Sequence, residues 1–247
     1  MQSTVVPQFF ETDLFVPKYS PFIGERWELR VVPLGACMGY WSDAKLIRDM
    51  AVLMRQEGAR GLMSWMSMTP MEIESQEIGC RLATGHTVVM GMGMGWAAAN
   101  AAIQPAVSRV TVVERDPEVI GLIRDTGIFE QLPPDAAAKI GVVQADALEW
   151  TSESPVDTLL ADIWLPLNGD DRVEHVRTMH RNTGAARVYY WGQEMTFARR
   201  ARAMGRTLDD ATLAAIIAEL GLPLIGPEWP DYAALSARAA AHWMREG

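Results

Sequence analysis

Three glycines at alternate positions, Gly91, Gly93 and Gly95, follow an apolar run at residues 87–90. Glycine permits tight backbone turns that other residues resist, and such a turn leaves the first amides of a following helix free to face a ligand. An acid, Glu114, closes the next apolar run, where the hydroxyl groups of a bound ribose would need a hydrogen-bond acceptor. This spacing predicts half of a nucleotide-binding α/β unit.

Two more acids stand at the ends of apolar runs further along the chain. Asp146 follows the run at 139–144, and Asp162 closes the run at 156–161. A carboxylate at the carboxyl end of a strand can neutralise a cationic ligand or take a proton from an attacking nucleophile. It can also serve only to cap the next turn, and this plainer alternative applies to Glu114 and to Asp162.

The glycine turn can be read in two registers. A dinucleotide fingerprint, G-x-G-x-x-G or A, does not match from Gly91, because Trp96 stands at its last position. It matches from Gly93, and Glu114 then lies about 20 residues further on, as a ribose-binding acid should. That register extends the strand to Met92, whereas G-x-G-x-G from Gly91 places the turn directly after the apolar run. We favour the second register, and an NAD-dependent oxidoreductase remains an alternative.

The elements that must position these residues alternate along the chain. Short apolar runs predict strands over 87–90, 109–113, 139–144, 156–161 and 187–191. Helices are predicted over 96–104, 116–125, 170–179, 195–204, 209–220 and 231–245, with a short extended piece at 223–225. Alternating strands and helices predict an α/β fold with a Rossmann-like, doubly wound and mainly parallel sheet. A helical C-terminal tail follows this sheet, without a clear sixth and seventh strand hairpin.

The N-terminal part carries different patterns, and we expect residues 1–85 to form an extension on a Rossmann-like domain of residues 86–247. Its first 25 residues read as an arm that packs through Phe9, Phe10, Phe15 and Phe22. Polar and apolar residues alternate from Trp27 to Val31, and a second apolar stretch at 36–41 completes a predicted β-hairpin. The apolar spacing at Leu46, Ile47, Met50, Leu53 and Met54 predicts a helix over 44–56 that ends at Gly58.

A second helix is predicted over 71–82, with Pro70 at its start. Because this helix directly precedes the first strand of the predicted sheet, it is expected to border the ligand, and Gln76 is our candidate for substrate binding. The preceding residues 61–69 are rich in methionine around Trp65. Adaptable core packing is the favoured interpretation of this stretch, ahead of a substrate-lining role.

Composition narrows the classes of partner. The chain has 22 Lys and Arg against 31 Asp and Glu, for a net charge of −9, and it has no basic run of the kind that binds nucleic acid. Neither the two cysteines nor the four histidines have metal-ligand spacing, so we expect no metal site. With no leader pattern and no apolar run of about 18 residues, we expect a cytoplasmic protein without membrane contact.

Four segments together resemble a known family. They are VVMGMGMG at 88–95, VTVVERDPEVI at 110–120, VVQADALEW at 142–150 and VDTLLADIW at 156–164. This succession resembles the class I S-adenosylmethionine-dependent transferases, and most closely their spermidine synthase-like, polyamine aminopropyltransferase-related branch. Val89 stands where ordinary methyltransferases of this class carry an acid, Val113 to Pro117 is similar to the branch's V-E-x-D-P, and Ala145-Asp146-Ala147 is similar to its G-D-A. The resemblance covers roughly residues 86–166.

The resemblance implies S-adenosylmethionine as the cofactor and assigns roles to individual residues. The implied cofactor-binding residues are Gly91, Met92, Gly93, Gly95, Glu114, Arg115, Asp146 and Ala147. Among them, Glu114 would bind the ribose hydroxyls and Asp146 the adenine amino group. Asp162 matches the acid that assists deprotonation of the attacking amine in aminopropyltransferases, and it is the catalytic candidate.

The chain also departs from the branch. Where the branch continues D-S-S-D-P, this chain has Asp162-Ile163-Trp164-Leu165-Pro166, so Leu165 replaces the second acid, and Met94 replaces an acid of the glycine turn. The apolar rim suits an apolar or aromatic acceptor, with Trp164 as a substrate-binding candidate. We therefore expect methyl transfer to an unidentified small molecule. The alternatives are aminopropyl or aminocarboxypropyl transfer, the oxidoreductase above, and a cofactor-binding protein without turnover; a homodimer is a further expectation.

Overall fold

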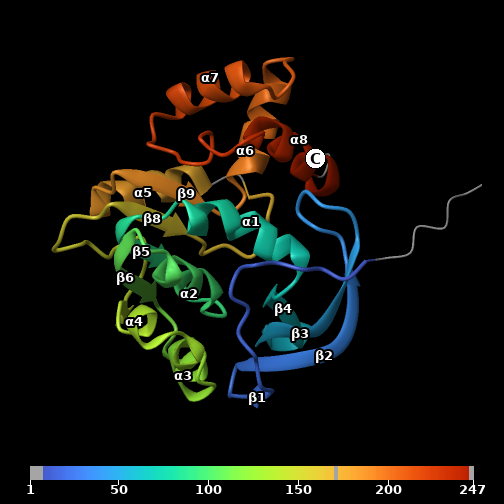
Figure 1. The fold of residues 1–247 in the computed structure, drawn as a ribbon, viewed down its shortest axis with the longest axis vertical. Helices are drawn as coiled ribbons and strands as arrows, with labels where there is room; N and C mark the ends of the chain where they lie inside the picture. Colours follow the sequence, from blue (N-terminus) through green and yellow to red (C-terminus); the bar gives the residue numbers. More distant parts are fainter. Residues whose placement is uncertain (1–7, 170–171, 245–247) are drawn as a thin grey trace, which may run out of the picture.

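The computed structural model describes residues 8–169 and 172–244, which form two sheets and the helices around them (Figure 1). One sheet has four antiparallel strands in the order β1-β2-β3-β4, and the other has five parallel strands in the order β7-β6-β5-β8-β9. The parallel sheet confirms the predicted Rossmann-like α/β fold.

The parallel sheet carries the predicted strands close to their expected positions. Its strands are β5 (Gly85–Met90), β6 (Val107–Glu114), β7 (Ile140–Gln144), β8 (Thr158–Ala161) and β9 (Arg187–Tyr190). From β5 the chain builds outward through β6 to β7, and it then returns to the other side of β5 to form β8 and β9. The strand order therefore reverses between β5 and β8, and ligands of open α/β sheets bind at such a switch point, outside the carboxyl ends of the strands.

The helices that precede or connect the parallel strands are α1 (Pro70–Arg81), α2 (Trp96–Ile103), α3 (Pro117–Asp125), α4 (Pro134–Ala137) and α5 (Arg172–Thr183), with short 3-10 turns η1 (Gly58–Arg60) and η2 (Phe129–Gln131). Helix α1 precedes the parallel sheet, and the next four helices connect its strands, except for β7 and β8, which residues 145–157 join without a helix. Helix α2 packs on β6 through alanines that are fully buried, because a small side chain lets the helix lie close to the sheet. Residues 170 and 171, at the start of one predicted helix, lie outside the described residues.

The antiparallel sheet corrects the prediction for residues 44–56. Its strands are β1 (Phe22–Ile23), β2 (Trp27–Cys37), β3 (Lys45–Gln56) and β4 (Leu62–Ser67). The predicted helix is strand β3, and the predicted second hairpin strand at 36–41 is wrong, because β2 itself continues to Cys37 and turns into β3. Ala51 and Leu53 are fully buried on one face of β3 while Met50 and Met54 are apolar on the other, so the pattern also fits a helix. Pairing with β2 and β4 on both sides decides the outcome.

The C-terminal helices gather at one end of the molecule (Figure 1). They are α6 (Gln193–Ala203), α7 (Asp210–Leu220) and α8 (Tyr232–Trp243). The extended piece expected at 223–225 lies beside β9, where Leu224 forms a single parallel bridge with Val188. Within the described part of the chain this bridge extends the sheet, and no sixth or seventh strand follows. Residue 245, the end of the last predicted helix, is outside the described residues.

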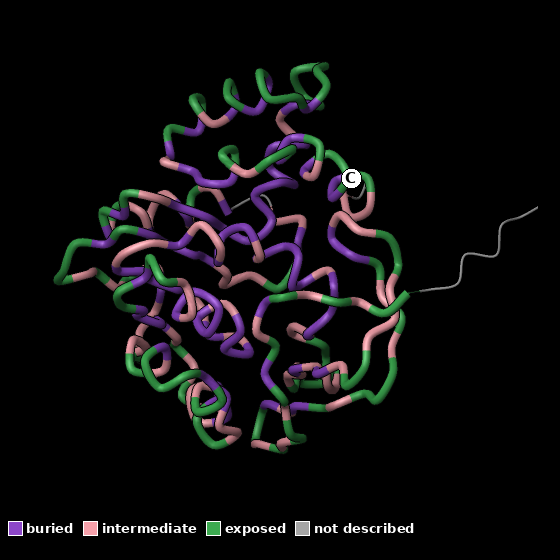
Figure 2. Tube along the Cα trace, viewed as in Figure 1, coloured by how far each residue is buried: buried purple, intermediate pink, exposed green. Residues whose placement is uncertain are grey.

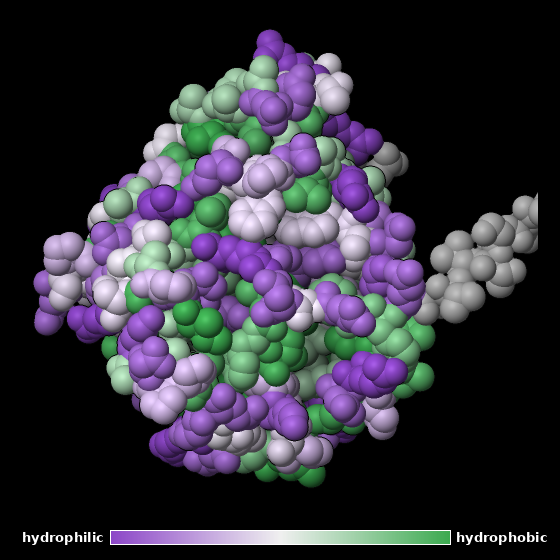
Figure 3. Space-filling view, viewed as in Figure 1, coloured by the Kyte–Doolittle hydropathy of each residue, from purple (hydrophilic) through white to green (hydrophobic). Residues whose placement is uncertain are grey.

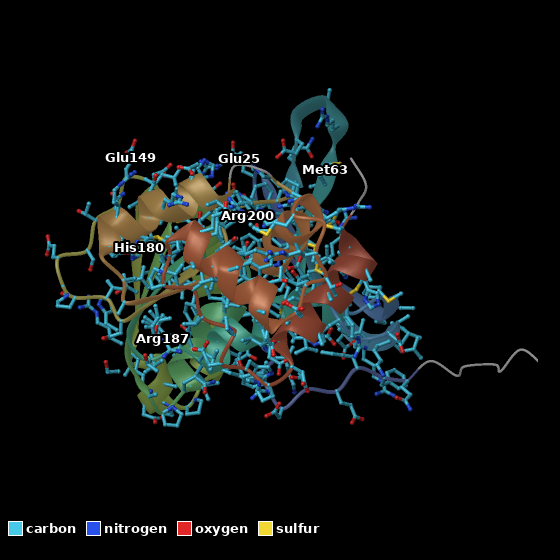
Figure 4. The ribbon with its side chains drawn as sticks, turned by 90° about the horizontal axis from the view of Figure 1, so that it is seen from above. Glu25, Met63, Glu149, His180, Arg187 and Arg200 are labelled. Atoms are coloured by element: carbon cyan, nitrogen blue, oxygen red, sulfur yellow. The ribbon has the colours of Figure 1, made fainter. Side chains whose placement is uncertain are left out.

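Burial is concentrated in the parallel sheet and the helices against it, whereas the outer sides of α7 and β2 are exposed (Figure 2). Hydrophilic side chains cover much of the face in Figure 3, and apolar side chains form several separate patches between them. Met63, at the β3–β4 hairpin, projects away from the rest of the molecule (Figure 4) and is 45% exposed. The predicted division at residue 86 falls one residue inside β5, and the separation into two domains stays a prediction.

Candidate functional site

The glycine turn begins where the favoured register places it, because β5 ends at Met90. Gly91, Gly93 and Gly95 have φ angles of 93°, 50° and 76°, in the left-handed region that favours glycine. A Cβ atom on Gly91 would lie 2.1 Å from the carbonyl oxygen of Asp162, and one on Gly93 would lie 2.4 Å from the sulfur of Met66. The two glycines thus allow the loop after β8 and the antiparallel sheet to approach the turn.

Glu114 ties this turn to the end of the neighbouring strand. Its Oε2 accepts a hydrogen bond from the Met92 amide at 2.9 Å, and its Oε1 accepts one from the Asp116 amide at 2.8 Å. Asp146, which follows the next strand, β7, also accepts a backbone hydrogen bond, because its Oδ1 accepts from the Leu148 amide at 2.8 Å. Both acids therefore fulfil the turn-capping role expected from strand-end carboxylates, and both also face a cavity.

This cavity, of about 270 Å³, lies outside the carboxyl ends of β5, β6 and β8, at the switch point of the sheet. The sequence-predicted residues that line it are Gln76, Gly91, Met92, Gly93, Glu114, Arg115, Asp146, Ala147, Asp162 and Trp164. Gly95 does not line it and instead caps the start of α2. The structure thus brings these residues together, while their individual roles stay predictions.

Asp162 occupies the loop directly after β8, held by its amide, which donates to the Met90 carbonyl oxygen at 2.9 Å. Its Oδ2 accepts a hydrogen bond from Nε2 of Gln76 at 3.1 Å. Burial raises the pKa of Asp162 from 3.8 to about 7, opposed by the positive charge of Arg172. A carboxyl group with this pKa exchanges a proton readily near neutral pH, as a general base must.

Helix α1 brings a second acid into the same cavity, and sequence reasoning missed it. The helix starts at Thr69, whose hydroxyl accepts a hydrogen bond from the Glu72 amide, and it points Glu72 and Gln76, one turn apart, toward the cavity. Each of these two side chains is 8% exposed. Burial raises the pKa of Glu72 well above its usual range, the charge of Asp162 raises it further, and the Ser67 backbone opposes both. The four-residue spacing is the only signal the sequence offers for this placement.

An aromatic group forms the wall beyond Asp162. The indole Nε1 of Trp164 donates to Nδ1 of His175 at 3.0 Å, and the planes of the two rings are inclined to one another by only 5°. The Nδ1 atom must be unprotonated to accept this bond. Trp191 also lines the cavity, whereas Leu165 is 39% exposed and does not.

The antiparallel sheet closes the cavity from the other side. Trp65 and Met66 line the cavity together with Trp27, so part of the methionine-rich stretch faces the site rather than serving only as core. The sheet is fastened to the start of α3, because Nε1 of Trp27 donates to Oδ2 of Asp116 at 2.9 Å and the Arg26 guanidinium donates to both oxygens of the same carboxylate. The N-terminal extension is therefore part of the site.

Neither a metal site nor a membrane-spanning helix is present in residues 8–169 and 172–244. Within these ranges no cluster of three or more His, Cys, Asp and Glu side chains is arranged to hold a metal ion. Over the same ranges no helix is both long enough and apolar enough to cross a bilayer.

No protein-family model and no curated protein sequence matches this chain. Many solved structures share part of its fold, and three of them illustrate the range. A glycopeptide N-methyltransferase, MtfA, complexed with S-adenosyl-L-homocysteine is 18% identical over 44% of this chain and 43% of its own, with a TM-score of 0.36. A precorrin-6y C5,15-methyltransferase from Geobacter metallireducens GS-15 is 20% identical over 47% and 58%, with a TM-score of 0.34.

The third, a spermidine synthase from Thermotoga maritima, is 13% identical over 62% of this chain and 54% of its own, with a TM-score of 0.35. The chain thus spans about half the length of each of these structures. At this level of likeness, the cofactor and the reaction must be argued from the chain's own residues.

Proposed function

We propose that this chain is an S-adenosylmethionine-dependent transferase that moves a methyl group to a small-molecule acceptor. One observation carries the proposal. The glycine turn and the strand-end acids Glu114, Asp146 and Asp162 line one cavity at the switch point of a parallel sheet. A cationic sulfonium cofactor is attracted by such an acidic cavity, and the motifs that resemble the class I transferases contribute the same residues.

The lining fits this cofactor group by group. Each oxygen of Glu114 accepts one backbone N–H and retains a lone pair for a ribose hydroxyl. Oδ2 of Asp146 forms only a long ion pair, 3.9 Å from the Arg115 guanidinium, so it retains a lone pair that can accept from an adenine amino group. The indole nitrogen of Trp96, a cavity-lining residue, is buried without a hydrogen-bond partner in the described part of the chain. It supplies a donor for the carboxylate of the methionine portion.

The chain's residues would act mainly by positioning. When bound, the cofactor supplies an electrophilic methyl carbon on sulfur. The cavity holds an acceptor between α1, the loop after β8 and the antiparallel sheet, where little water enters. Asp162 takes the proton that the acceptor loses, and Gln76 orients the Asp162 carboxylate through the bond at 3.1 Å.

Aminopropyl transfer is the second candidate, and Glu72 favours it. Loss of the second acid at Leu165 argues against a polyamine acceptor when only the sequence is considered. Leu165 lies outside the cavity, however, whereas Glu72 provides a second carboxyl group inside it. A cationic amine acceptor is therefore compatible with the site.

Calorimetric titration of the protein with S-adenosylhomocysteine, and separately with NAD, tests the cofactor. We expect S-adenosylhomocysteine to bind and NAD not to bind. Binding of NAD alone would overturn the proposal in favour of the oxidoreductase that the Gly93 register suggests.

Product analysis then separates the two transfers. Incubation with S-adenosylmethionine and a mixture of small acceptors should release S-adenosylhomocysteine. Robust methylthioadenosine from decarboxylated S-adenosylmethionine and an amine would replace methyl transfer by aminopropyl transfer. A protein that binds cofactor but turns over neither donor, and whose Asp162→Asn variant is indistinguishable from it, would be a cofactor-binding protein without catalysis.

A further inference from the structure

Glu72 and Asp162 bring two buried carboxyl groups into one cavity, and neither is bonded to a cationic side chain in the described part of the chain. Both line the cavity, and neither forms an ion pair among the described residues. The positive charge of Arg172 acts on Asp162, but its guanidinium donates to the Trp191 carbonyl oxygen at 2.6 Å and stacks 5.1 Å from the Trp164 ring. Among the described residues, the two arginines that line the cavity are held by other partners, since Arg55 lies over the rings of Trp27 and Trp65 and Arg115 lies 3.9 Å from Asp146. Two buried acids, neither bonded to a cation of the described residues, favour a ligand that brings its own positive charge.

Gln76 fixes the geometry of the pair. It stands one helical turn from Glu72 on α1, and its side-chain amide donates to Asp162 at 3.1 Å. The Gln76 amide thus connects helix α1, which carries Glu72, with the loop after β8, which carries Asp162. This places the two carboxyl groups on the same side of the cavity.

The rest of this end of the cavity is aromatic and apolar. Trp164, Trp191 and Ile163 line it, and the faces of indole rings attract cations. The other lining acids, Glu114, Asp116 and Asp146, lie on the far side, beyond β5 and toward β7. This end of the cavity therefore offers a place for the positive charge of a ligand and, beside it, an apolar surface for the carbon skeleton of the same ligand.

We propose that Glu72 and Asp162 form a carboxyl pair that binds the amino group of a small apolar monoamine, and that this amine is the acceptor of the transferred group. The inference rests on the proposed function and names the substrate class for the same cavity. It also makes Glu72, which no sequence motif indicates, a residue that determines acceptor specificity.

Transfer of the methyl group to the amine conserves protons and electrons. The amine enters as an ammonium ion and passes one proton to the Asp162 carboxylate, which frees its lone pair. The lone pair forms the new N–C bond to the methyl carbon, and the C–S bond breaks with its electrons left on sulfur as a neutral thioether. The product leaves as a methylammonium ion, and Asp162 then releases its proton to solvent. Glu72 stays in contact with the nitrogen throughout.

Amine binding is measured by calorimetry on protein saturated with S-adenosylhomocysteine. The probes are hexylamine, hexanol as its neutral counterpart, and 1,4-diaminobutane as a dication. We expect hexylamine to bind more tightly than either. The Glu72→Gln variant should weaken hexylamine binding by at least about tenfold while leaving the affinity for S-adenosylhomocysteine unchanged.

Glu77→Gln is the matched control on the same helix, because Glu77 pairs with Arg81 and does not line the cavity. It should leave hexylamine binding unchanged. The inference is overturned if hexanol binds as well as hexylamine, if the diamine binds more tightly, or if Glu72→Gln changes nothing. Failure of S-adenosylhomocysteine to bind at all would instead overturn the proposed function, and this inference with it.

Discussion

Gly91 is the residue at which the ends of β5 and β8 touch. Its φ angle of 93° is strained for any other residue, and a Cβ atom there would lie 2.1 Å from a backbone oxygen that cannot move aside. We expect Gly91→Ala to lower the free energy of unfolding by at least about 2 kcal/mol, measured by urea denaturation. Gly141→Ala is the control, because a Cβ atom at Gly141 would meet nothing within 4 Å. Equal stability of the two variants would contradict this account of the turn.

The Asp162 carboxyl group should make stability depend on pH. Burial raises its folded-state pKa from 3.8 to about 7, so the folded protein binds this proton more tightly than the unfolded chain does. Asp162 therefore contributes stability below about pH 4 that is lost as the pH rises through 7. The Asp162→Asn variant does not titrate, so its melting temperature should rise relative to the wild type between pH 4 and pH 8. Parallel melting curves across this range would show that the carboxyl group is not buried as described.

For single residues, the sequence predicted where the glycine turn and the strand-end acids lie, because these positions follow from the points at which the strands end. It did not predict Glu72. A glutamate on the polar side of a helix usually faces water, and only the packing of α1 against the end of β8 turns that side toward a cavity. The sequence contains no local signal for packing between elements so distant along the chain.

Among the elements, the antiparallel sheet departs most from expectation. Strand β3 carries apolar residues on both faces, so the spacing of these residues fits a helix as well as a strand. What decides between them is hydrogen bonding to β2 and β4, a choice made by tertiary structure. The helices flanked by a capping residue or a proline, such as α1 and α3, were by contrast predicted to within a residue or so.

The contact between this sheet and α3 should be essential for ligand binding. Asp116 caps α3 by accepting from the Glu118 amide at 3.1 Å, and it also receives the Trp27 indole and the Arg26 guanidinium. We expect Asp116→Ala to cost about 1 to 2 kcal/mol of stability and to weaken S-adenosylhomocysteine binding, as measured by thermal melting and calorimetry. Asp125→Ala, at the exposed end of the same helix, should change neither. If the Asp116→Ala variant had the melting temperature of the wild type, contacts other than those of Asp116 would hold the antiparallel sheet against α3.

On the scale of the whole molecule, a single buried carboxylate joins three distant segments. Glu194 accepts hydrogen bonds from the hydroxyls of Tyr40, Tyr189 and Tyr232 at 2.9, 2.8 and 2.6 Å. These tyrosines come from the segment before β3, from β9 and from α8, so the network connects the N-terminal extension to the C-terminal helices. The alternation of strands and helices predicted the parallel sheet, but no sequence pattern predicts this cluster, because its members meet only in the folded core.

Removing this carboxylate should destabilise the entire fold. Glu194→Ala would leave the buried hydroxyls of Tyr40 and Tyr232 without their acceptor and leave Tyr189 with only the Ser75 carbonyl oxygen. We expect a loss of about 3 kcal/mol or more in the free energy of unfolding. Glu219→Ala removes an exposed partner of Arg200 and should cost less than about 1 kcal/mol. Chemical denaturation of both variants tests this difference. Similar losses in the two would show that the tyrosine network carries little of the stability.

The walls of the cavity have an optical consequence. Of the nine tryptophans in the chain, five line this one space: Trp27, Trp65, Trp96, Trp164 and Trp191. Indole emission responds to the polarity and charge around the ring, so we expect a nucleoside or a cation bound in the cavity to change the emission of several tryptophans at once. The protein thereby carries its own fluorescent indicator of occupancy, and its ligands can be screened by their effect on its emission without any attached label.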